Sequence, residues 1–339
     1  MMALFKKDPI HIIPFRSYGT PNHLYAKGRA LEDENIDLTQ KGFLPMLQIA
    51  YKRFWTDLIK NRPLILTFSD GRSIKTQTDI QGYYIVDQAV DSLLTLVDKD
   101  GYLKYKISFA KQFPGREIQH GNNFEGEILI PNANAKFGVI SDIDDTIIHT
   151  GLTSRLKWRV VKNTFFKRAE KRLPLDGAAE FYTELQKGKS GEDCNPIFYV
   201  SHSPWNLYHY LELFLRKNNF PKGSLLLRDF ANPIKNLFQP KTKGEKPEKQ
   251  REILNILKTY PKLSFILIGD SGEHDPDIYL EIAEAHPERI LAIYLRSVNH
   301  RRKMLRTEGL FEHYETVPVL LVKSSGAALH HAREMGFIK

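Results

Sequence analysis

One stretch near the middle of the chain constrains the fold most: the apolar run Phe137–Ile140, followed at once by Ser-Asp-Ile-Asp-Asp-Thr. A run of this length and type predicts a buried strand. It ends in three acids within four residues, Asp142, Asp144 and Asp145. Buried carboxylates at a strand end are costly unless something binds them, and a divalent cation is the usual partner. Asp142 and Asp144 point to the same side of an extended strand, so the pattern predicts a magnesium site.

These acids have two other interpretations. A calcium loop of the EF-hand type would need Gly at its sixth position and Glu at its twelfth. Counted from Asp142, those positions hold Ile147 and Thr153, which excludes such a loop. The simpler alternative is a strand that ends in a solvated acidic turn. The full Asp-Ile-Asp-Asp-Thr pattern after an apolar strand favours the metal site over that turn.

The length and charge of the chain bound the kind of protein it forms. Its 339 residues are enough for two domains with proper cores. It has one cysteine, Cys194, and neither a signal-peptide pattern nor an apolar run of membrane-spanning length. We therefore expect a cytoplasmic protein in a reducing compartment. The net charge of +9 favours anionic partners, such as nucleic acid, anionic lipid or phosphorylated substrates.

Residues 1–134 are predicted to form a mostly β, sandwich-like accessory domain. Short strand-like segments alternate with turn pairs such as Asp70-Gly71 and Asp100-Gly101, a spacing typical of antiparallel sandwiches. One amphipathic helix is predicted over Phe43–Lys60. The predicted strands are Ile10–Phe15, His23–Ala30, Pro63–Phe68, Ser73–Thr78, Gly82–Val86, Leu93–Val97, Leu103–Phe109 and Phe124–Ile130.

Residues 135–339 are predicted to form an α/β domain, because apolar strands alternate there with amphipathic helices around a parallel sheet. The predicted strands are Phe137–Ser141, Pro196–Ser201, Gly223–Leu227, Leu263–Gly269, Ile290–Tyr294 and Val317–Val322. The predicted helices are Gly177–Gln186, Pro204–Asn218, Pro247–Thr259, Asp277–Ala285 and Ser325–Met335. Ligands of such sheets bind beyond the carboxyl ends of the strands, so those ends are where a site is expected.

Polar residues follow two further strands of this sheet. Ser201 ends the second strand, and Ser203 and Pro204 are predicted to begin a helix as its N-cap and first residue. Phosphate oxygens bind well beside a helix N-terminus. Asp270 and Asp275 follow the strand Leu263–Gly269, the second apolar strand that terminates in carboxylates.

A lysine on a predicted helix completes the set of candidate residues. Lys249 lies one turn before Ile253, on the face of the helix that carries the apolar residues Ile253, Ile256 and Leu257. An ammonium group on a buried face needs an anionic partner.

In this order, a DxDxT motif, a strand-end serine, a helix-borne lysine and a GDxxxxD motif resemble the haloacid-dehalogenase-like phosphatase superfamily. The closer resemblance is to the actin-patch-associated phosphatidate phosphatases, bacterial-type members with a lipin-like catalytic domain. It rests on Ser141–Thr146, Tyr199–Trp205, Gly269–Asp275 and Val317–Val322, and on Arg16–Pro21 in the amino-terminal part. The resemblance implies a Rossmann-like catalytic domain preceded by a β-sandwich.

The resemblance also implies a role for each candidate residue. Asp142 would attack phosphorus to form an aspartyl-phosphate, and Asp144 would protonate the leaving oxygen and then activate water. Thr146 would brace the loop and bind the substrate phosphate together with Ser201 and Lys249, which would stabilise its charge.

The implied cofactor is Mg²⁺. Its predicted ligands are Asp142, the backbone carbonyl of Asp144, and Asp270. Asp275 is predicted to support the site, through a metal-bound water or by orienting Lys249. The sequence has no cluster of His or Cys that would favour zinc instead.

A basic amphipathic segment at 151–175 bears on the substrate class. Lys and Arg are frequent in it, and Leu152, Leu156, Val160 and Phe165 recur at helical spacing. Such a segment fits an anionic lipid surface, and it equally fits a helix packed on the protein with a solvated basic face. The resemblance favours lipid, which would make the protein peripheral at a membrane.

Four functions therefore remain open. The leading hypothesis is a Mg²⁺-dependent phosphatidate phosphatase, a phosphoric monoester hydrolase that releases diacylglycerol. The second keeps the chemistry but gives it a soluble phosphomonoester. The third is a non-catalytic module that binds phosphatidate, against which the pair Asp142 and Asp144 argues. The fourth and weakest is nucleic-acid binding: the basic segment would then bind DNA or RNA in a salt-sensitive way, but no other pattern in the chain is typical of a nucleic-acid-binding fold.

Overall fold

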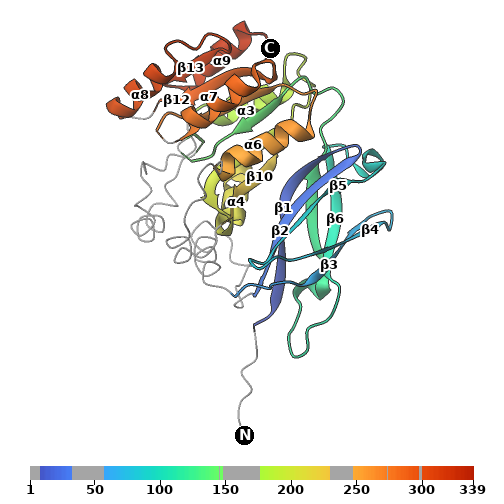
Figure 1. Ribbon diagram of the computed structural model, residues 1–339. Coiled ribbons are helices and arrows are strands. Elements are labelled where there is room, and N and C mark those ends of the chain that lie inside the picture. Colours follow the sequence, from blue (N-terminus) through green and yellow to red (C-terminus); the bar gives the residue numbers. More distant parts are fainter. Residues whose placement is uncertain are drawn as a thin grey trace. The chain divides into compact units, whose positions relative to one another are not determined.

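The computed structural model describes residues 8–32, 57–144, 146–147, 176–229, 247–272, 274–297 and 300–339 (Figure 1). They form two compact units. The first takes in the described residues up to Ile130 together with Tyr208–Tyr210, and the second takes in the rest. The basic segment predicted at 151–175 and most of the helix predicted over Phe43–Lys60 lie outside the described residues.

The first unit is one seven-stranded sheet in the order β4-β3-β6-β7-β1-β2-β5. The edge strands β4 and β5 also contact each other, and the Thr76 hydroxyl donates to the Ile85 carbonyl at 3.3 Å. The sheet therefore curls around one apolar core. Its strands are β1 (Ile10–Thr20), β2 (His23–Glu32), β3 (Pro63–Phe68), β4 (Ser73–Gln77), β5 (Tyr83–Ala89), β6 (Tyr102–Phe109) and β7 (Phe124–Leu129).

The mostly β character predicted for this region is confirmed, with three corrections. One curled sheet takes the place of separate antiparallel sheets, and β1 pairs with β7 in parallel. Leu93–Val97 is not a strand: Leu93–Leu96 is a 3₁₀ helix, η1, which buries only Leu93 and follows Ser92 in the left-handed conformation (φ 58°). The end of the predicted helix, at residues 57–60, is not helical, because Leu58 forms a β-bridge with Leu31.

The second unit is built on a six-stranded sheet in the order β10-β9-β8-β11-β12-β13. Every neighbouring pair is parallel. The carboxyl ends of all six strands therefore lie at one edge of the sheet. The strands are β8 (Gly138–Ser141), β9 (Ile197–Pro204), β10 (Ser224–Arg228), β11 (Phe265–Asp270), β12 (Ile290–Arg296) and β13 (Val319–Val322).

Helices cover both faces of this sheet. Successive side chains of a strand point to opposite faces. On β11, Gly269 lies against Tyr279 of α7, whereas Ile268 faces a cavity lined by α3 and α9. Helices α6 and α7 also contact each other, as do α3 and α9. The bounds are α3 (Ala178–Lys187), α4 (Tyr208–Lys217), α6 (Glu248–Thr259), α7 (Asp275–Ala285), α8 (Arg301–Phe311) and α9 (Ser325–Glu334).

The parallel α/β organisation predicted for this region is confirmed, and two local predictions are wrong. Ser203 is not an N-cap, because β9 continues through Pro204 and a 3₁₀ turn, η5 (Trp205–Leu207), precedes α4. Helix α8 was not predicted, because Thr307 is its only buried residue and so no apolar stripe marks it in the sequence. None of the helices in the described ranges is long and apolar enough to cross a bilayer.

Candidate active site

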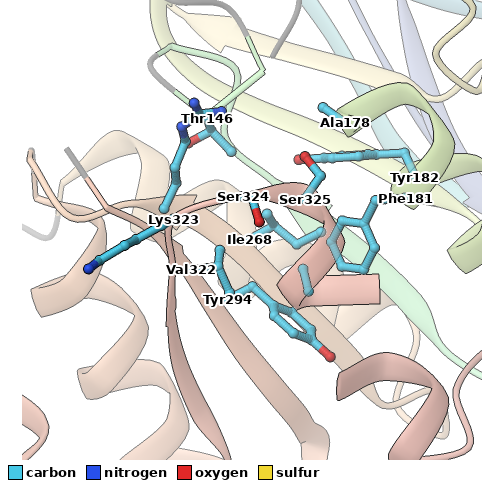
Figure 2. A pocket seen from close by; sticks show the side chains of 12 residues that line it. Thr146, Ala178, Phe181, Tyr182, Ile268, Tyr294, Val322, Lys323, Ser324 and Ser325 are labelled. Carbon is cyan, nitrogen blue, oxygen red and sulfur yellow. The ribbon is translucent and has the colours of Figure 1, made fainter. Parts of the chain in front are cut away.

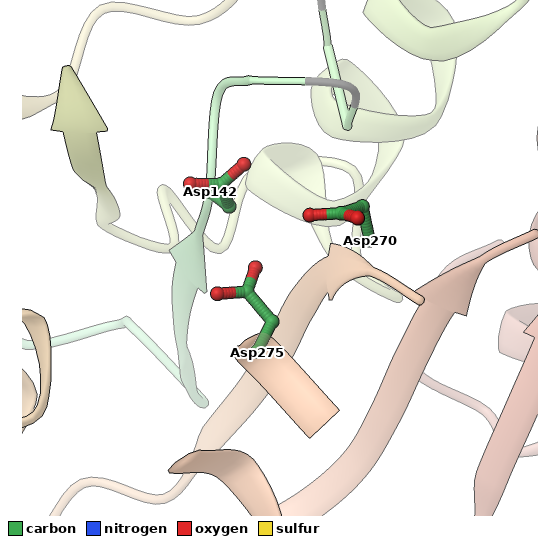
Figure 3. A group of neighbouring side chains, drawn as sticks. All are labelled: Asp142, Asp270 and Asp275. Carbon is green, nitrogen blue, oxygen red and sulfur yellow. The ribbon is translucent and has the colours of Figure 1, made fainter. Parts of the chain in front are cut away.

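Three buried carboxylates meet at the carboxyl edge of the parallel sheet (Figure 3). Asp142 directly follows β8, Asp270 is the last residue of β11, and Asp275 is the first residue of α7. One carboxylate oxygen from each lies within 4.8 Å of the others. We call these three residues the acid cluster. It forms because β8 and β11 are neighbours in register, with the Asp142 amide donating to the Ile268 carbonyl at 2.8 Å.

Lys249 of α6 is ion-paired with two members of the acid cluster. Its Nζ donates to Asp142 Oδ1 at 2.7 Å and to Asp275 Oδ1 at 2.6 Å. The Lys249 side chain is 1% exposed, so both pairs are shielded from water. Burial alone would lower the pKa of Lys249, but the charges of Asp142 and Asp275 outweigh it and raise that pKa well above its usual value. The ammonium is therefore a fixed positive charge in the site.

The pKa of Asp142 is raised well above its usual value. Burial is the main cause, and the neighbouring carboxylates Asp275, Asp144 and Asp270 add to it while Lys249 opposes it. Three carboxylates with one ammonium carry a surplus of two negative charges when all are ionised. A divalent cation would neutralise that surplus.

The donor atoms of the acid cluster fit Mg²⁺. Its three members offer carboxylate oxygens, the ligands that hard cations prefer. Asp142 Oδ2 and Asp275 Oδ2 are buried, and neither has a hydrogen-bond partner among the described residues. Buried carboxylate oxygens left in this state are costly, and a bound cation removes that cost. Asp275 belongs to the acid cluster itself, whereas the sequence predicted only a supporting role for it.

Asp144 lies beside this cluster and is held by two serines of β9. Ser201 Oγ donates to Asp144 Oδ2 at 2.9 Å, and Ser203 Oγ donates to the same oxygen at 2.7 Å. The Ser203 amide in turn donates to Ser201 Oγ at 2.8 Å. Both serines are buried, so they fix the Asp144 carboxylate in one orientation.

Packing behind the acid cluster sets the position of Asp275. A Cβ on Gly269 would lie 2.5 Å from Asp275 Oδ2 and 2.7 Å from the Tyr279 ring. Only glycine therefore leaves room for α7 to begin so close to β11. The Tyr279 hydroxyl donates to the Ile268 carbonyl at 2.9 Å, which fastens α7 to the same strand.

Helix α8 packs against the loop that follows Asp270. The Gly272 amide donates to Asp270 Oδ1 at 2.5 Å, and Lys303 donates to the Gly272 carbonyl. The Thr307 hydroxyl donates to the Ser271 carbonyl at 3.3 Å. These contacts orient the Asp270 carboxylate toward the cluster.

The structure brings together Asp142, Lys249, Asp270 and Asp275, and it places Asp144 with Ser201 next to them. Thr146 is buried but lines a separate cavity (Figure 2). Sequence reasoning missed Ser203 as a partner of Asp144. The spacing held the signal, because Ser201 and Ser203 are two residues apart and share one side of an extended strand.

The fold and the site define a class of protein. It is a parallel α/β domain whose carboxyl edge carries a buried carboxylate and lysine site fit for a divalent cation. Within that class, residues 137–297 match the family described as "Phosphatidate phosphatase APP1, catalytic domain" and belong to it.

Two fungal proteins and one solved structure illustrate the similarity. The chain is 31% identical over 245 residues to "Phosphatidate phosphatase APP1" of Saccharomyces cerevisiae, covering 72% of this chain and 39% of that protein. It is 27% identical over 222 residues to an uncharacterized protein of Schizosaccharomyces pombe, covering 65% of this chain and 34% of that protein. The chain thus spans well under half the length of either relative. The solved structure of EndoBT-3987 from Bacteroides thetaiotamicron aligns with 84% of this chain and 77% of its own chain, at 7% sequence identity. The TM-score of 0.24 is too low for this alignment to support an argument about the fold.

Proposed function

We propose that the second unit is a Mg²⁺-dependent phosphatase that hydrolyses phosphatidate through an aspartyl-phosphate on Asp142. One observation carries the proposal: Lys249, Asp142, Asp270 and Asp275 form one buried group at the carboxyl edge of a parallel sheet. The family match and the yeast relative's name support the substrate. The motif order supports a haloacid-dehalogenase-like fold for this unit.

The residues at hand fit one Mg²⁺. Asp142, Asp270 and Asp275 would hold it, with the backbone carbonyl of Asp144 as a further ligand expected from the motif. When bound, the cation supplies positive charge that offsets the repulsion between an anionic nucleophile and an anionic phosphate.

The protein's own groups then divide the reaction between them. Asp142 attacks phosphorus, and the bond from phosphorus to the alcohol oxygen breaks. Asp144, oriented by Ser201 and Ser203, gives its proton to that oxygen. It next takes a proton from the water that attacks the aspartyl-phosphate, which releases inorganic phosphate and restores Asp142. The buried ammonium of Lys249 stabilises the charge on the transferring group.

The rest of the chain completes the proposal. Residues 135–339 are the catalytic domain, and residues 1–134 are an accessory domain. Ser201 contacts the substrate phosphate, whereas Thr146, which lines the separate cavity, braces the loop of the motif. The net charge of +9 and the basic segment 151–175 support a cytoplasmic protein that acts at an anionic membrane surface.

The test is phosphate release from phosphatidate in mixed micelles, with and without Mg²⁺. The wild type is compared with Asp142→Asn and with the control Asp277→Asn, whose carboxylate is an exposed partner of Arg306. We expect release that needs both the metal and Asp142 and that survives Asp277→Asn. Turnover of a soluble aryl phosphate alone would move the substrate to the soluble pool. No metal-dependent release from either substrate would refute the proposal.

A further inference from the structure

A cavity of about 30 Å³ lies at the carboxyl edge of β12 and β13, where α3 and α9 pack against the sheet (Figure 2). Its polar lining includes Thr146, Arg296, Lys323, Ser324 and Ser325. Among the described residues, neither the acid cluster nor Lys249 lines it. We call it the α9 cavity, and nothing in the proposed reaction uses it.

The N-terminus of α9 is able to accept an anion. The helix has no acidic residue in its first turn, and the Ser324 side chain makes no capping hydrogen bond. A Cβ on Gly326 would meet only Ser324 Oγ, at 3.8 Å, so space remains above the first turn. Free amides and the positive end of the helix dipole favour an anion at such a terminus.

A second observation, independent of the helix, also points to a ligand. Thr146 is 6% exposed and lines the cavity, yet its Oγ1 has no hydrogen-bond partner among the described residues. A buried hydroxyl without a partner costs free energy. A group with acceptor oxygens in the cavity would accept a hydrogen bond from that hydroxyl.

The positively charged side chains at the cavity favour a ligand with negative charge. Arg296 at the end of β12 lines the cavity, and Lys323 is exposed at its rim with its side chain turned outward in Figure 2. Apolar neighbours such as Phe181 and Tyr294 exclude water and strengthen ionic contacts there.

The size of the cavity limits the ligand to a small group. A water molecule needs roughly 10–15 Å³ in this measure. A cavity of about 30 Å³ therefore has room for two or three water-sized groups, such as the oxygens at one side of a phosphate, and excludes an acyl chain.

We propose that the α9 cavity binds a second phosphate group, held by the first turn of α9, Arg296 and Thr146, beside the acid cluster and apart from it. The phosphate is either free inorganic phosphate or the phosphodiester of a phospholipid headgroup. Both present the same oxygens to the cavity. The subsite requires neither Mg²⁺ nor turnover.

Calorimetric titration of the full chain with inorganic phosphate in EDTA tests this subsite. Without a metal, the carboxylates of the acid cluster repel anions, so binding reports the α9 cavity. Gly326→Asp places a negative charge in the first turn, where it favours the helix and repels phosphate. Gly326→Asn is the control, because asparagine has the size of aspartate without its charge. Arg296→Gln removes the guanidinium charge.

Wild type and Gly326→Asn should bind phosphate with affinities within about twofold, since neither adds a charge. Gly326→Asp and Arg296→Gln should bind about tenfold more weakly or worse, the loss of one charge-assisted contact. The Tm of Gly326→Asp should equal or exceed that of Gly326→Asn. No binding by the wild type, or equal binding by all variants, would overturn the proposal. So would an equal loss in Gly326→Asn and Gly326→Asp.

A second arm identifies the source of the phosphate. Phosphatidylcholine vesicles that contain phosphatidylglycerol are added to the wild-type complex with inorganic phosphate. Displacement of phosphate from both the wild type and Gly326→Asn, which binds phosphate equally well, supports the subsite with a lipid headgroup as its ligand. No displacement supports it with free phosphate. Because no catalysis is measured, failure of this subsite is distinguishable from failure of the proposed phosphatase.

Discussion

Replacement of Lys249 with methionine tests the electrostatics of the site most severely. The change keeps the packing of the aliphatic part of the side chain but removes the ammonium that pairs with Asp142 and Asp275. Removing one partner of a buried ion pair costs about 3–5 kcal/mol, because the remaining charge is left uncompensated. For a unit of this size, that corresponds to a Tm lower by about 6–20 °C.

The stability lost in Lys249→Met should depend on pH, and in one direction only. Without the ammonium, which opposes the rise, the pKa of Asp142 in the folded state exceeds that of the unfolded chain by more than it does in the wild type. Such an acid binds protons more strongly when folded, so the stability of Lys249→Met falls as pH rises above the unfolded pKa of about 4. The wild type keeps the stabilisation from Lys249 below a pH of about 10, since the Lys249 pKa is raised. The deficit of the variant should therefore shrink toward acidic pH.

The assay is thermal and denaturant unfolding of the wild type and Lys249→Met in EDTA, from acidic to neutral pH. Lys258→Met, an exposed lysine on the same helix, is the control and should cost no more than about 1 kcal/mol. Mg²⁺ should restore part of the lost stability, because it supplies positive charge to the same carboxylates. A deficit that is independent of pH, or no larger than that of the control, would refute this account of the site.

Further outcomes follow from the same geometry. Mg²⁺ at about one hundred times its Kd should stabilise the wild type by about 2.7 kcal/mol in thermal unfolding, and Asp142→Asn should lose that gain; an unchanged gain would remove Asp142 as a ligand. Because burial raises the pKa of Asp142, Mg²⁺ affinity should rise with pH, and calorimetry in buffers of different ionisation enthalpy should detect a released proton. Ser203→Ala should lower kcat roughly tenfold or more while leaving KM nearly unchanged, since Ser203 orients Asp144 and does not bind substrate; a change confined to KM would contradict that role. Gly269→Ala should displace Asp275 and weaken Mg²⁺ binding, whereas Gly309→Ala, which meets no atom within 4 Å, should not.

The sequence predicted most of the sheet that carries the site. Parallel strands such as β8 and β11 are nearly continuous apolar runs, and their ends are marked by Asp142 and Asp270. The position of Lys249 on the apolar face of α6 predicted an anionic partner, and the structure supplies Asp142 and Asp275. These features were predictable because one local pattern determines each of them.

Other features depend on contacts that no local pattern encodes. Helix α8 is held by hydrogen bonds to the loop after Asp270 and not by an apolar stripe, so the 3.6-residue periodicity does not reveal it. The Ser-Pro pair at 203–204 has the composition of a helix start, but pairing with β10 extends β9 through it. The α9 cavity combines residues from distant parts of the sequence, among them Thr146, Tyr182, Arg296 and Ser325, and only the fold brings them together.

The central claim is that Asp142 accepts the phosphoryl group, and the most direct test is to trap that group. Asp144→Asn can neither protonate a leaving alcohol nor activate the water that hydrolyses the intermediate, so an aryl phosphate, whose leaving group departs without a proton, should form the intermediate and leave it unhydrolysed. The variant is mixed with an aryl phosphate and Mg²⁺, quenched in acid, digested and analysed by mass spectrometry. We predict one phosphoryl group on Asp142, absent from Asp142→Asn/Asp144→Asn. A phosphoryl group on another residue, or active turnover without any phosphorylated peptide, would contradict the account.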